Sequence, residues 1–175
     1  MKKLLIKIII FTIILFTFTG CYSLSKMYLY RGVPTTNTSN IMDYIYMYTL
    51  PSNQNDRNTS ISHIFLEVNT RKQKYKKVEI LTNKVKILYQ EKEYYVNVSD
   101  DKTYILIYKN GLNITGDFII YLGKIRFDGW KVIEAPPIKV QKYVKVTKYN
   151  PIADGLNINT AQDIYYGPAE GYKGR

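Results

Sequence analysis

Short runs of apolar and aromatic residues, separated by turn-forming residues, fill the chain from residue 43 onward. The clearest runs read DYIYMYTL, SHIFLEVN, KVKILYQ, KEYYVNV, TYILIYK and DFIIYLGKIRF. Several of them alternate apolar with polar positions, which is the period of a strand with one buried face. No window of eleven or more residues in this part of the chain has a convincing helical period. The pattern therefore predicts a domain of antiparallel strands.

Turn signals stand between these runs. Asn110-Gly111 and Asp128-Gly129 are dipeptides that favour the type I′ turn, in which both central residues have positive φ. Thr82-Asn83 and residues 99–101 are looser turn signals, and Pro136-Pro137 indicates a change of direction between sheets. Regularly spaced strands joined by such turns predict an antiparallel β-sandwich, with a small β-barrel as the alternative.

Two runs have faces that can be assigned from their alternation. In the first, one face carries Tyr44, Tyr46 and Tyr48, and the other carries Ile45, Met47 and Thr49. The tyrosine face is either a half-buried packing surface or an exposed stripe for a carbohydrate or protein partner. In the second run, the apolar face carries Ile138, Val140, Val144 and Val146. Lys142 interrupts that face, which predicts an edge strand or a bulge there.

The first twenty residues follow a different pattern. Lys2, Lys3 and Lys7 form a basic start, and residues 8–18 are apolar apart from two threonines. This apolar length is typical of a signal peptide and is shorter than the roughly 20 residues that span a bilayer. The segment predicts a signal peptide over residues 1–20.

The signal segment ends in Phe18-Thr19-Gly20-Cys21, and Cys21 is the one cysteine of the chain. This ending resembles the lipobox of bacterial lipoprotein precursors, although Phe18 stands where an aliphatic residue is usual. The resemblance implies cleavage between Gly20 and Cys21, a diacylglycerol on the Cys21 thiol and a further acyl group on the new amino terminus. It covers the first twenty-odd residues only and identifies a class of precursor.

Two other interpretations of Cys21 fit less well. Ordinary signal-peptidase cleavage after Gly20 requires small residues one and three positions before the cut, and Phe18 occupies the third position. A buried structural thiol needs a folded element around it, whereas a polar, turn-rich stretch follows Cys21. A chain with one cysteine has no internal disulfide and no thiolate metal site, so its core must hold the domain together.

These patterns divide the chain into a signal peptide (1–20), a lipidated N-terminus and tether (21–42), a β domain (43–150) and a loop-rich tail (151–175). A first edge strand at residues 26–31 fits the tether as well. The lipoprotein resemblance implies a bacterial cell-envelope protein held at a membrane by its N-terminal lipid. Tyr22 follows the cysteine, where an acidic residue commonly retains such lipoproteins at the inner membrane, so the outer membrane is favoured where the cell has one.

Basic residues are concentrated in one short stretch of the chain. The net charge is +11, and the three lysines of the signal segment supply three of these charges. Five basic residues surround a tyrosine in the stretch Arg71, Lys72, Lys74, Tyr75, Lys76 and Lys77. This composition favours an anionic glycan or surface partner. The other interpretation is a solvated hairpin loop whose lysines protect strand edges from pairing with other chains. A genome rich in AT codons would also produce many lysines and tyrosines.

Candidate catalytic residues are few. His63 is the one histidine, and no Gly-x-Ser-x-Gly elbow accompanies it. Asp100, Asp101 and Asp117 offer oxygen atoms to a cation, but no EF-hand loop is present and a role in turns is simpler. We expect a non-enzymatic structural or interaction module without metal or cofactor. Its expected partners are the membrane and an envelope protein or glycan, and not nucleic acid.

Two alternatives to a structural module stay open. One is a ligand-binding β module that uses the basic stretch 71–77 and neighbouring tyrosines. The other is a hydrolase built on a pair of carboxylates, because such pairs form in space and leave no sequence signature.

Overall fold

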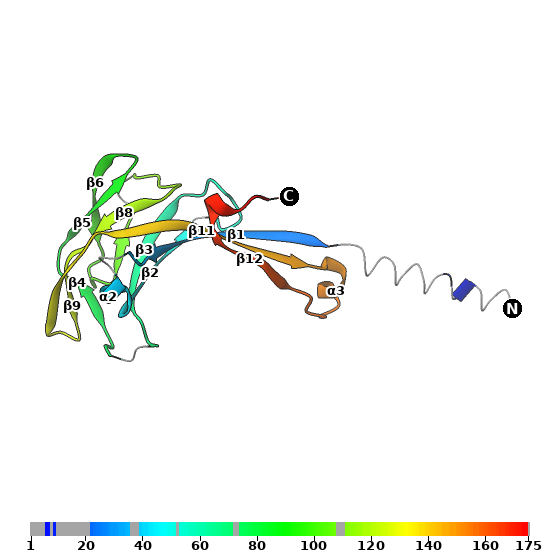
Figure 1. The fold of residues 1–175 in the computed structure, drawn as a ribbon, viewed down its shortest axis with the longest axis horizontal. Coiled ribbons are helices and arrows are strands. Elements are labelled where there is room, and N and C mark those ends of the chain that lie inside the picture. The colour runs from blue at the N-terminus through cyan, green and yellow to red at the C-terminus, as the bar shows by residue number, and fades with distance from the viewer. Residues whose placement is uncertain are drawn as a thin grey trace. The chain divides into compact units, whose positions relative to one another are not determined.

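The structure is a computed structural model that describes residues 6, 7, 9, 22–35, 39–51, 53–71, 74–107 and 111–174. It is nearly all β, with 53% of residues in strands and 9% in helices, and eight antiparallel strands close into a barrel (Figure 1). The all-β antiparallel class predicted from the sequence is confirmed. Of the two architectures that the strand pattern allowed, the main sheet takes the barrel, and a second sheet accompanies it.

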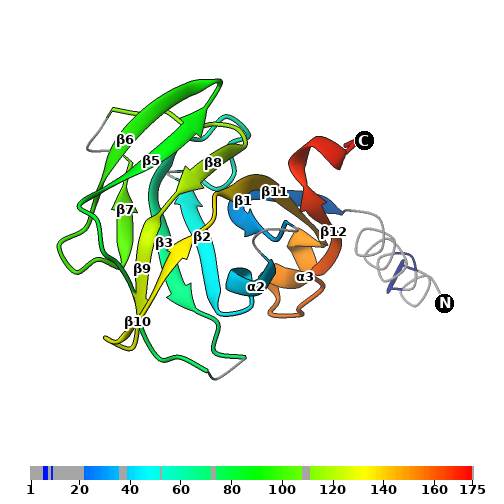
Figure 2. The ribbon, with the colours of Figure 1, turned by 60° about the vertical axis from the view of Figure 1, so that its left-hand side comes forward.

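The barrel strands follow one another in the order β1, β2, β3, β7, β6, β5, β8 and β11, and β11 pairs with β1 to close the sheet. Their bounds are β1 Ser23–Val33, β2 Ile45–Pro51, β3 Ile61–Val68, β5 Lys84–Tyr89, β6 Lys92–Val98, β7 Tyr104–Leu106, β8 Phe118–Tyr121 and β11 Ile138–Tyr149. Beyond β11 the sheet continues to β12, Gln162–Pro168. Figure 2 shows β2, β3, β5, β6, β7 and β8 together in the wall.

A smaller sheet has the order β10, β9 and β4. Its strands are β4 Val78–Ile80, β9 Gly123–Phe127 and β10 Lys131–Ala135. The helices that lie wholly within the described residues are short: α2 Ser39–Met42, α3 Pro151–Gly155 and the 3-10 helix η2 Ala169–Gly171. None of the helices within the described ranges combines the length and apolar character that crossing a bilayer requires.

The chain forms two compact units, and both β1 and β11 contribute residues to each. The barrel unit comprises Met27–Val144 and Gly167–Arg175, and the hairpin unit comprises Met1–Lys26 and Lys145–Tyr166. The hairpin unit therefore contains the end of β11, helix α3 and most of β12.

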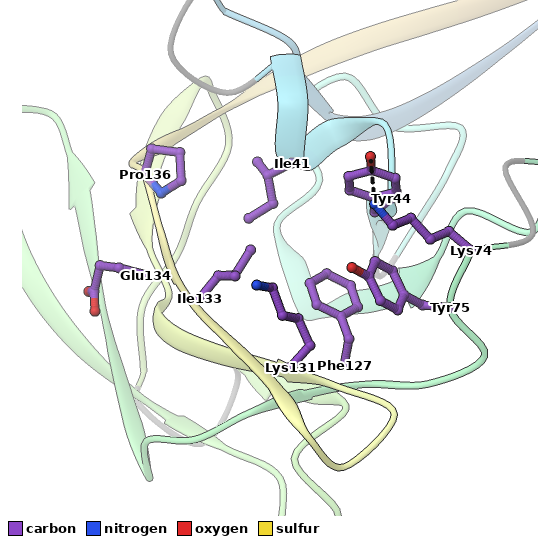
Figure 3. Close-up of a pocket in the computed structure, with 9 residues that line it drawn as sticks. All are labelled: Ile41, Tyr44, Lys74, Tyr75, Phe127, Lys131, Ile133, Glu134 and Pro136. Carbon is purple, nitrogen blue, oxygen red and sulfur yellow. Dashed lines mark hydrogen bonds between the residues drawn. The ribbon is translucent and has the colours of Figure 1, made fainter.

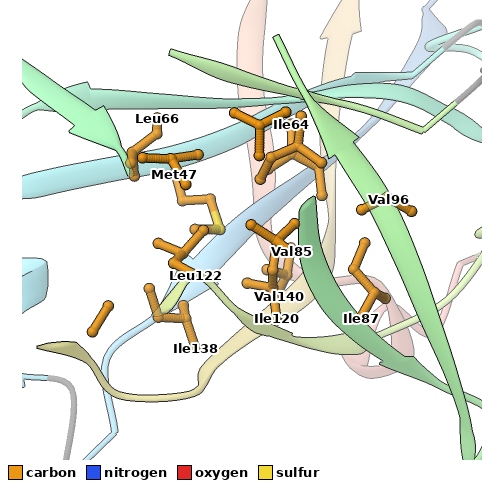
Figure 4. Packing of buried hydrophobic residues seen from close by; sticks show 14 of the residues in the cluster. Met47, Ile64, Leu66, Val85, Ile87, Val96, Ile120, Leu122, Ile138 and Val140 are labelled. Carbon is orange, nitrogen blue, oxygen red and sulfur yellow. The ribbon is translucent and has the colours of Figure 1, made fainter. Parts of the chain in front are cut away.

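Apolar side chains at alternate positions of the barrel strands meet in one core (Figure 4). Ile64, Ile87 and Ile120, from three different strands, have no exposed surface. Each such side chain contributes about 1.5–3 kcal/mol by leaving water. The buried sets include Ile45, Met47 and Thr49 of β2, and Ile138, Val140, Val144 and Val146 of β11. The faces assigned from the alternation of both runs are thus confirmed.

The turn predicted at Asp128-Gly129 is confirmed. The two residues have φ values of 47° and 80°, and the Trp130 amide donates to the Phe127 carbonyl oxygen at 3.1 Å. A similar turn that the sequence did not reveal joins β5 to β6 through Gln90-Glu91, with φ values of 49° and 63°. Asn110, half of the other predicted dipeptide, lies outside the described residues.

The structure corrects the predicted tether and the predicted tail. Residues 21–42 contain the long strand β1, which covers the strand allowed at residues 26–31, and residues 151–175 contain α3, β12 and η2. Strands β1 and β12 both form by backbone pairing with β11, and local composition does not reveal such pairing. Helix α3 forms because the Asn150 side chain accepts hydrogen bonds from the amides of Ile152 and Ala153 at its N-terminus.

Lys142 interrupts the apolar face of β11, as the sequence shows, and its side chain lies inside the barrel unit. Strand β11 continues through Lys142, although its backbone pairing with β8 covers Ile138, Lys139 and Val140, and the Lys142 amide donates to Asp117 Oδ1 at 2.9 Å. The residue is 9% exposed, because the alternation of β11 turns its side chain inward. Its interior partners are polar groups rather than solvent.

The predicted signal peptide lies outside the described residues apart from Ile6, Lys7 and Ile9. The predicted cleavage and lipidation site at Gly20 and Cys21 lies outside them altogether. Both therefore stay predictions from the sequence.

Candidate ligand-binding pocket around Tyr75

A pocket of about 310 Å³ opens in the barrel unit beside Tyr75 (Figure 3). Three segments contribute to it: α2 with the start of β2, the basic stretch before β4, and the β9–β10 hairpin. Its lining consists of Ile41, Tyr44, Lys74, Tyr75, Phe127, Lys131, Ile133, Glu134 and Pro136. A second hollow, of about 510 Å³, shares Tyr75 and is also lined by Val68, Thr70 and Lys76. Apolar walls with a few polar groups are typical of ligand sites.

Aromatic rings form one wall of the pocket. The Tyr75 ring stacks on Phe127, with centroids 4.3 Å apart and planes 24° apart. The Tyr44 ring meets Tyr75 edge to face, with centroids 5.5 Å apart and planes 81° apart. Each contact of this kind contributes about 0.5–1.5 kcal/mol beyond burial. The Tyr75 ring is therefore held in place before any ligand arrives.

Lys74 places a cation beside these rings. Its Nζ lies 4.6 Å from the Tyr44 ring centroid and 5.6 Å from that of Tyr75. It also donates a hydrogen bond to the Tyr44 hydroxyl oxygen at 3.3 Å. This hydrogen bond, followed by the charges on the two phenol groups, raises the pKa of Lys74 above its ordinary value. The ammonium is charged at neutral pH and attracted to the ring faces.

The carboxylate of Asp128 holds the basic stretch against the β9–β10 hairpin. Its Oδ1 accepts hydrogen bonds from the amides of Lys76 and Lys77, each at 2.8 Å. The Asp128 amide in turn donates to the Lys77 carbonyl oxygen at 3.1 Å. At the other end of the stretch, the Asn69 amide donates to the Tyr44 carbonyl oxygen at 2.7 Å. Asp128, recognised in the sequence only as a turn residue, is thus a positioning residue for the pocket.

The structure brings together only part of the predicted basic patch. Lys74 and Tyr75 line the first pocket, and Lys76 with Tyr75 lines the second. Arg71 is exposed and contributes to neither lining, while Lys72 lies outside the described residues. Lys77 turns instead to Glu79, with its Nζ 2.7 Å from the carboxylate.

The partners of Glu79 explain why Lys77 is separated from the pocket. The Glu79 carboxylate also accepts hydrogen bonds from Nε and Nη2 of Arg126 on the neighbouring strand, at 2.9 and 2.7 Å. The hydrogen bonds from Lys77 and then from Arg126 lower the pKa of Glu79. The carboxylate therefore stays ionised and neutralises this end of the basic stretch.

Three lining residues come from parts of the chain far from the basic stretch, namely Tyr44, Phe127 and Lys131. Tyr44 was recognised as part of a tyrosine stripe, but nothing in the sequence connected Tyr44, Phe127 and Lys131 with the basic stretch. Figure 3 shows the Lys131 amine and the Tyr75 hydroxyl pointing toward the middle of the group, and the Glu134 carboxylate pointing away. The groups that face the hollow are therefore amines, phenols and apolar surface.

The other residues singled out in the sequence have structural partners. His63 packs against Phe65 and Tyr104, with ring centroids 5.9 and 5.6 Å away. Tyr48 stacks on Phe65 and donates to Glu67, whereas Tyr46 is 42% exposed and Tyr44 lines the pocket. The tyrosine face is thus divided between packing, solvent and the pocket. Asp101 accepts a hydrogen bond from Ser99 within the turn before β7.

The described residues contain no cluster of three or more side chains able to hold a metal ion. Asp117 accepts a hydrogen bond from the Lys142 amide at 2.9 Å, whereas Asp100 borders a different hollow with Asn83 and Lys102. The carboxylates that the sequence offered as oxygen ligands thus have separate surroundings.

Comparison with protein-family models, with curated proteins and with solved structures gives no match for this chain. Function is therefore inferred from the chemistry of the pocket and from the resemblance of the signal segment.

Proposed function

We propose that this protein is a lipid-anchored, non-enzymatic binding module of the bacterial cell envelope, and that the Tyr75 pocket binds an anionic carbohydrate. The observation that supports this proposal is the Lys74 ammonium held over Tyr44 beside Tyr75, with Lys131 directed to the same hollow. Sugar rings pack their C–H faces on aromatic rings, and a carboxylate or sulfate group pairs with ammonium ions. The lining of the pocket contains both aromatic rings and ammonium groups.

The charge of the lining favours binding over a purely structural role. Two amines directed to one hollow repel each other, and an anion between them removes that repulsion. The one carboxylate in the lining, Glu134, points away from the hollow. A pair of carboxylates flanking a scissile bond, as glycoside hydrolysis requires, does not face this pocket. The ligand-binding module is therefore the alternative that the geometry supports best.

The volume limits the size of the ligand. About 310 Å³ lies at the lower end of the range for small-molecule sites. A terminal sugar or one unit of a longer chain suits it, and the second hollow beside Tyr75 and Lys76 extends the surface for a neighbouring unit. An oligosaccharide should therefore bind more tightly than its monosaccharide.

Titration of a uronic acid tetrasaccharide, followed by calorimetry, tests the pocket. Lys74→Gln should weaken binding about tenfold, as expected for loss of one charge-assisted contact. Lys77→Gln is the matched control, because it removes the same charge from the same stretch but its partner is Glu79. Equal losses in both variants would mean that the ligand responds only to overall charge. Binding of a neutral tetrasaccharide with equal affinity would also contradict the proposal.

The anchor has its own test. The intact mass and membrane fractionation of the expressed protein should show loss of residues 1–20 and addition of lipid. The Cys21→Ala variant should lack both changes. A soluble, unlipidated product from the unaltered gene would overturn the anchoring part of the proposal and leave the pocket to be judged separately.

A further inference from the structure

Large apolar side chains are exposed across the hairpin unit. Beyond the signal segment, those of this unit that are between 42% and 59% exposed are Tyr22, Leu24, Ile152, Leu156, Ile158, Ile164 and Tyr166. A contiguous exposed apolar surface on a folded protein marks a partner. These side chains would form such a surface if they lie on the same side of the hairpin unit.

The contacts of Asp163 and Lys148 place four of these side chains relative to the strands. The Asp163 carboxylate contacts Thr147 Oγ1 at 2.8 Å and Lys145 Nζ at 2.9 Å, so this polar group occupies one face of the β11–β12 pair. Because strand side chains alternate, Lys148 of β11 lies on the opposite face. The same alternation places Ile164 and Tyr166 of β12 there.

Strand β1 supplies the rest of this face. The Nζ atom of Lys148 lies 3.7 Å from the centroid of the Tyr22 ring, so Tyr22 belongs to the same side. Leu24 follows two residues later and shares that side by alternation. We name the surface formed by Tyr22, Leu24, Lys148, Ile164 and Tyr166 the Tyr22 face. The hairpin unit is thus amphipathic, with an ion pair on one side and aromatic and aliphatic groups on the other.

The loop between β11 and β12 carries the remaining exposed apolar groups, and hydrogen bonds hold it in shape. The Asp154 carboxylate accepts hydrogen bonds from the amide and the hydroxyl of Thr160, both at 2.9 Å. The Ile158 amide donates to the Ala153 carbonyl oxygen at 2.9 Å. Ile152, Leu156 and Ile158 are therefore presented to solvent by an ordered loop, which indicates a surface prepared for contact.

The position of the face along the chain points to its partner. Strand β1 begins at Ser23, two residues after Cys21, and an extended chain covers at most about 3.6 Å per residue. A lipid on Cys21 would therefore bring the Tyr22 face to within about 10 Å of the headgroups. Tyrosine with aliphatic neighbours and nearby lysine is the composition that settles at a membrane interface.

We infer that the Tyr22 face and the α3 loop dock on the bilayer that holds the lipid anchor. The inference rests on the proposed anchoring at Cys21, which supplies the proximity. Apolar side chains form most of the surface, and Lys145 is paired with Asp163 on the other side. Binding should therefore occur on uncharged lipid mixtures and change little with salt, unlike binding through the basic stretch near Tyr75.

The test uses the chain from residue 21 onward with Cys21→Ser, which has no signal segment and no lipid. Co-sedimentation with phosphatidylcholine vesicles should recover the protein with the vesicles at both 0.1 and 0.5 M salt. Leu156→Asp combined with Ile164→Asp should lower the partition coefficient at least tenfold. Trp130→Asp combined with Tyr95→Asp is the matched control, since these barrel-unit side chains are 71% and 62% exposed; it should change the coefficient less than twofold.

Three results would overturn the inference. The first is that the unlipidated chain does not bind vesicles, and the second is that the control variant loses as much binding as the test variant. The third is a dimer in solution that Leu156→Asp converts to monomer, because this would assign the face to a second copy. The claim of a lipid anchor and the claim of membrane docking can be refuted independently. A protein found unlipidated in cells would refute the anchor while vesicle binding by the Cys21→Ser chain still supported the face.

Discussion

The ammonium group of Lys142 donates a hydrogen bond to the carbonyl oxygen of Thr115 at 2.8 Å, inside the barrel unit. It also donates to the carbonyl oxygen of Arg57, and it lies 5.3 and 5.6 Å from the ring centroids of Tyr28 and Tyr30. Burial, and then the charge of Arg57, lower the pKa of Lys142. One inward side chain thus ties β11 to the loop before β3 and to the segment before β8.

Truncation of Lys142 should destabilise the barrel unit. Lys142→Ala removes both hydrogen bonds and leaves a cavity, so the free energy of unfolding should fall by about 2–4 kcal/mol. Lys142→Met keeps most of the volume and removes a buried charge, so its loss should be smaller, about 1 kcal/mol. Urea unfolding of the two variants checks the order. A Met variant less stable than the Ala variant would contradict the role given to side-chain volume.

Replacing Tyr30 by phenylalanine should stabilise the protein. The Tyr30 hydroxyl is buried and has no hydrogen-bond partner among the described residues, and an unsatisfied buried hydroxyl costs about 1 kcal/mol or more. Burial also raises the pKa of Tyr30, with smaller contributions from Tyr89 and Asp117. Above pH 10 the Tyr30 hydroxyl ionises in the unfolded chain but stays neutral in the folded protein. The stability that is present below pH 10 is therefore lost as the pH rises further.

The advantage of Tyr30→Phe should therefore grow between pH 9 and pH 11. Denaturant unfolding at both pH values measures this change. Tyr95→Phe is the control, because Tyr95 is 62% exposed and its loss of one hydroxyl should change the free energy of unfolding little. A Tyr30→Phe variant that is less stable at pH 9 would mean that the hydroxyl has a partner in solution.

Glu79 should contribute stability that depends on pH in the opposite sense. The hydrogen bonds from Lys77 and then Arg126 lower its pKa below the ordinary value of 4.5. Its contribution is complete above that value and is lost as the pH falls through the folded-state pKa. Glu79→Gln should cost at most about 1 kcal/mol at pH 7, since its partners Lys77 and Arg126 are 60% and 40% exposed and solvent screens these ion pairs. Thermal unfolding at pH 7 and pH 3 should show the difference shrinking at the lower pH, and a constant difference would exclude this origin.

Asp128 should act on the pocket without touching a ligand. Asp128→Ala removes the acceptor for the amides of Lys76 and Lys77 and puts alanine at a positive φ. Hydrogen exchange of those two amides should accelerate, and the uronic acid tetrasaccharide should bind more weakly. Asp128→Asn keeps an oxygen acceptor and tolerates the same backbone conformation, so it should restore both properties. Failure of Asn to do so would assign the effect to the charge of Asp128.

The Gln90-Glu91 turn is a place to gain stability. Both residues have positive φ, a conformation that favours asparagine and glycine in a type I′ hairpin. Replacing the pair by Asn-Gly should raise the free energy of unfolding by about 0.5–1 kcal/mol. Chemical denaturation checks this value. The same replacement should leave saccharide binding unchanged, because neither residue lines the Tyr75 pocket.

The sequence alone determined the class of the fold and much of its local structure. Strict alternation identified the buried faces of β2 and β11, because a period of two is the geometry of a strand with one face in a core. The Asp128-Gly129 turn was predictable because few residues tolerate positive φ. The basic stretch also predicted a cationic site, and of its described residues Lys74, Tyr75 and Lys76 contribute to the two hollows.

The tertiary structure decided what depends on contacts between distant residues. Closure of the barrel needs β1 to pair with β11, and any strand edge offers the same backbone groups, so side-chain patterns cannot name the partner. The pocket needs Tyr44, Tyr75 and Phe127 to meet, and the interior place of Lys142 needs carbonyl groups from two loops. Local residue identity determines the period and the turns, whereas these features arise only when long-range backbone pairing brings separate segments together.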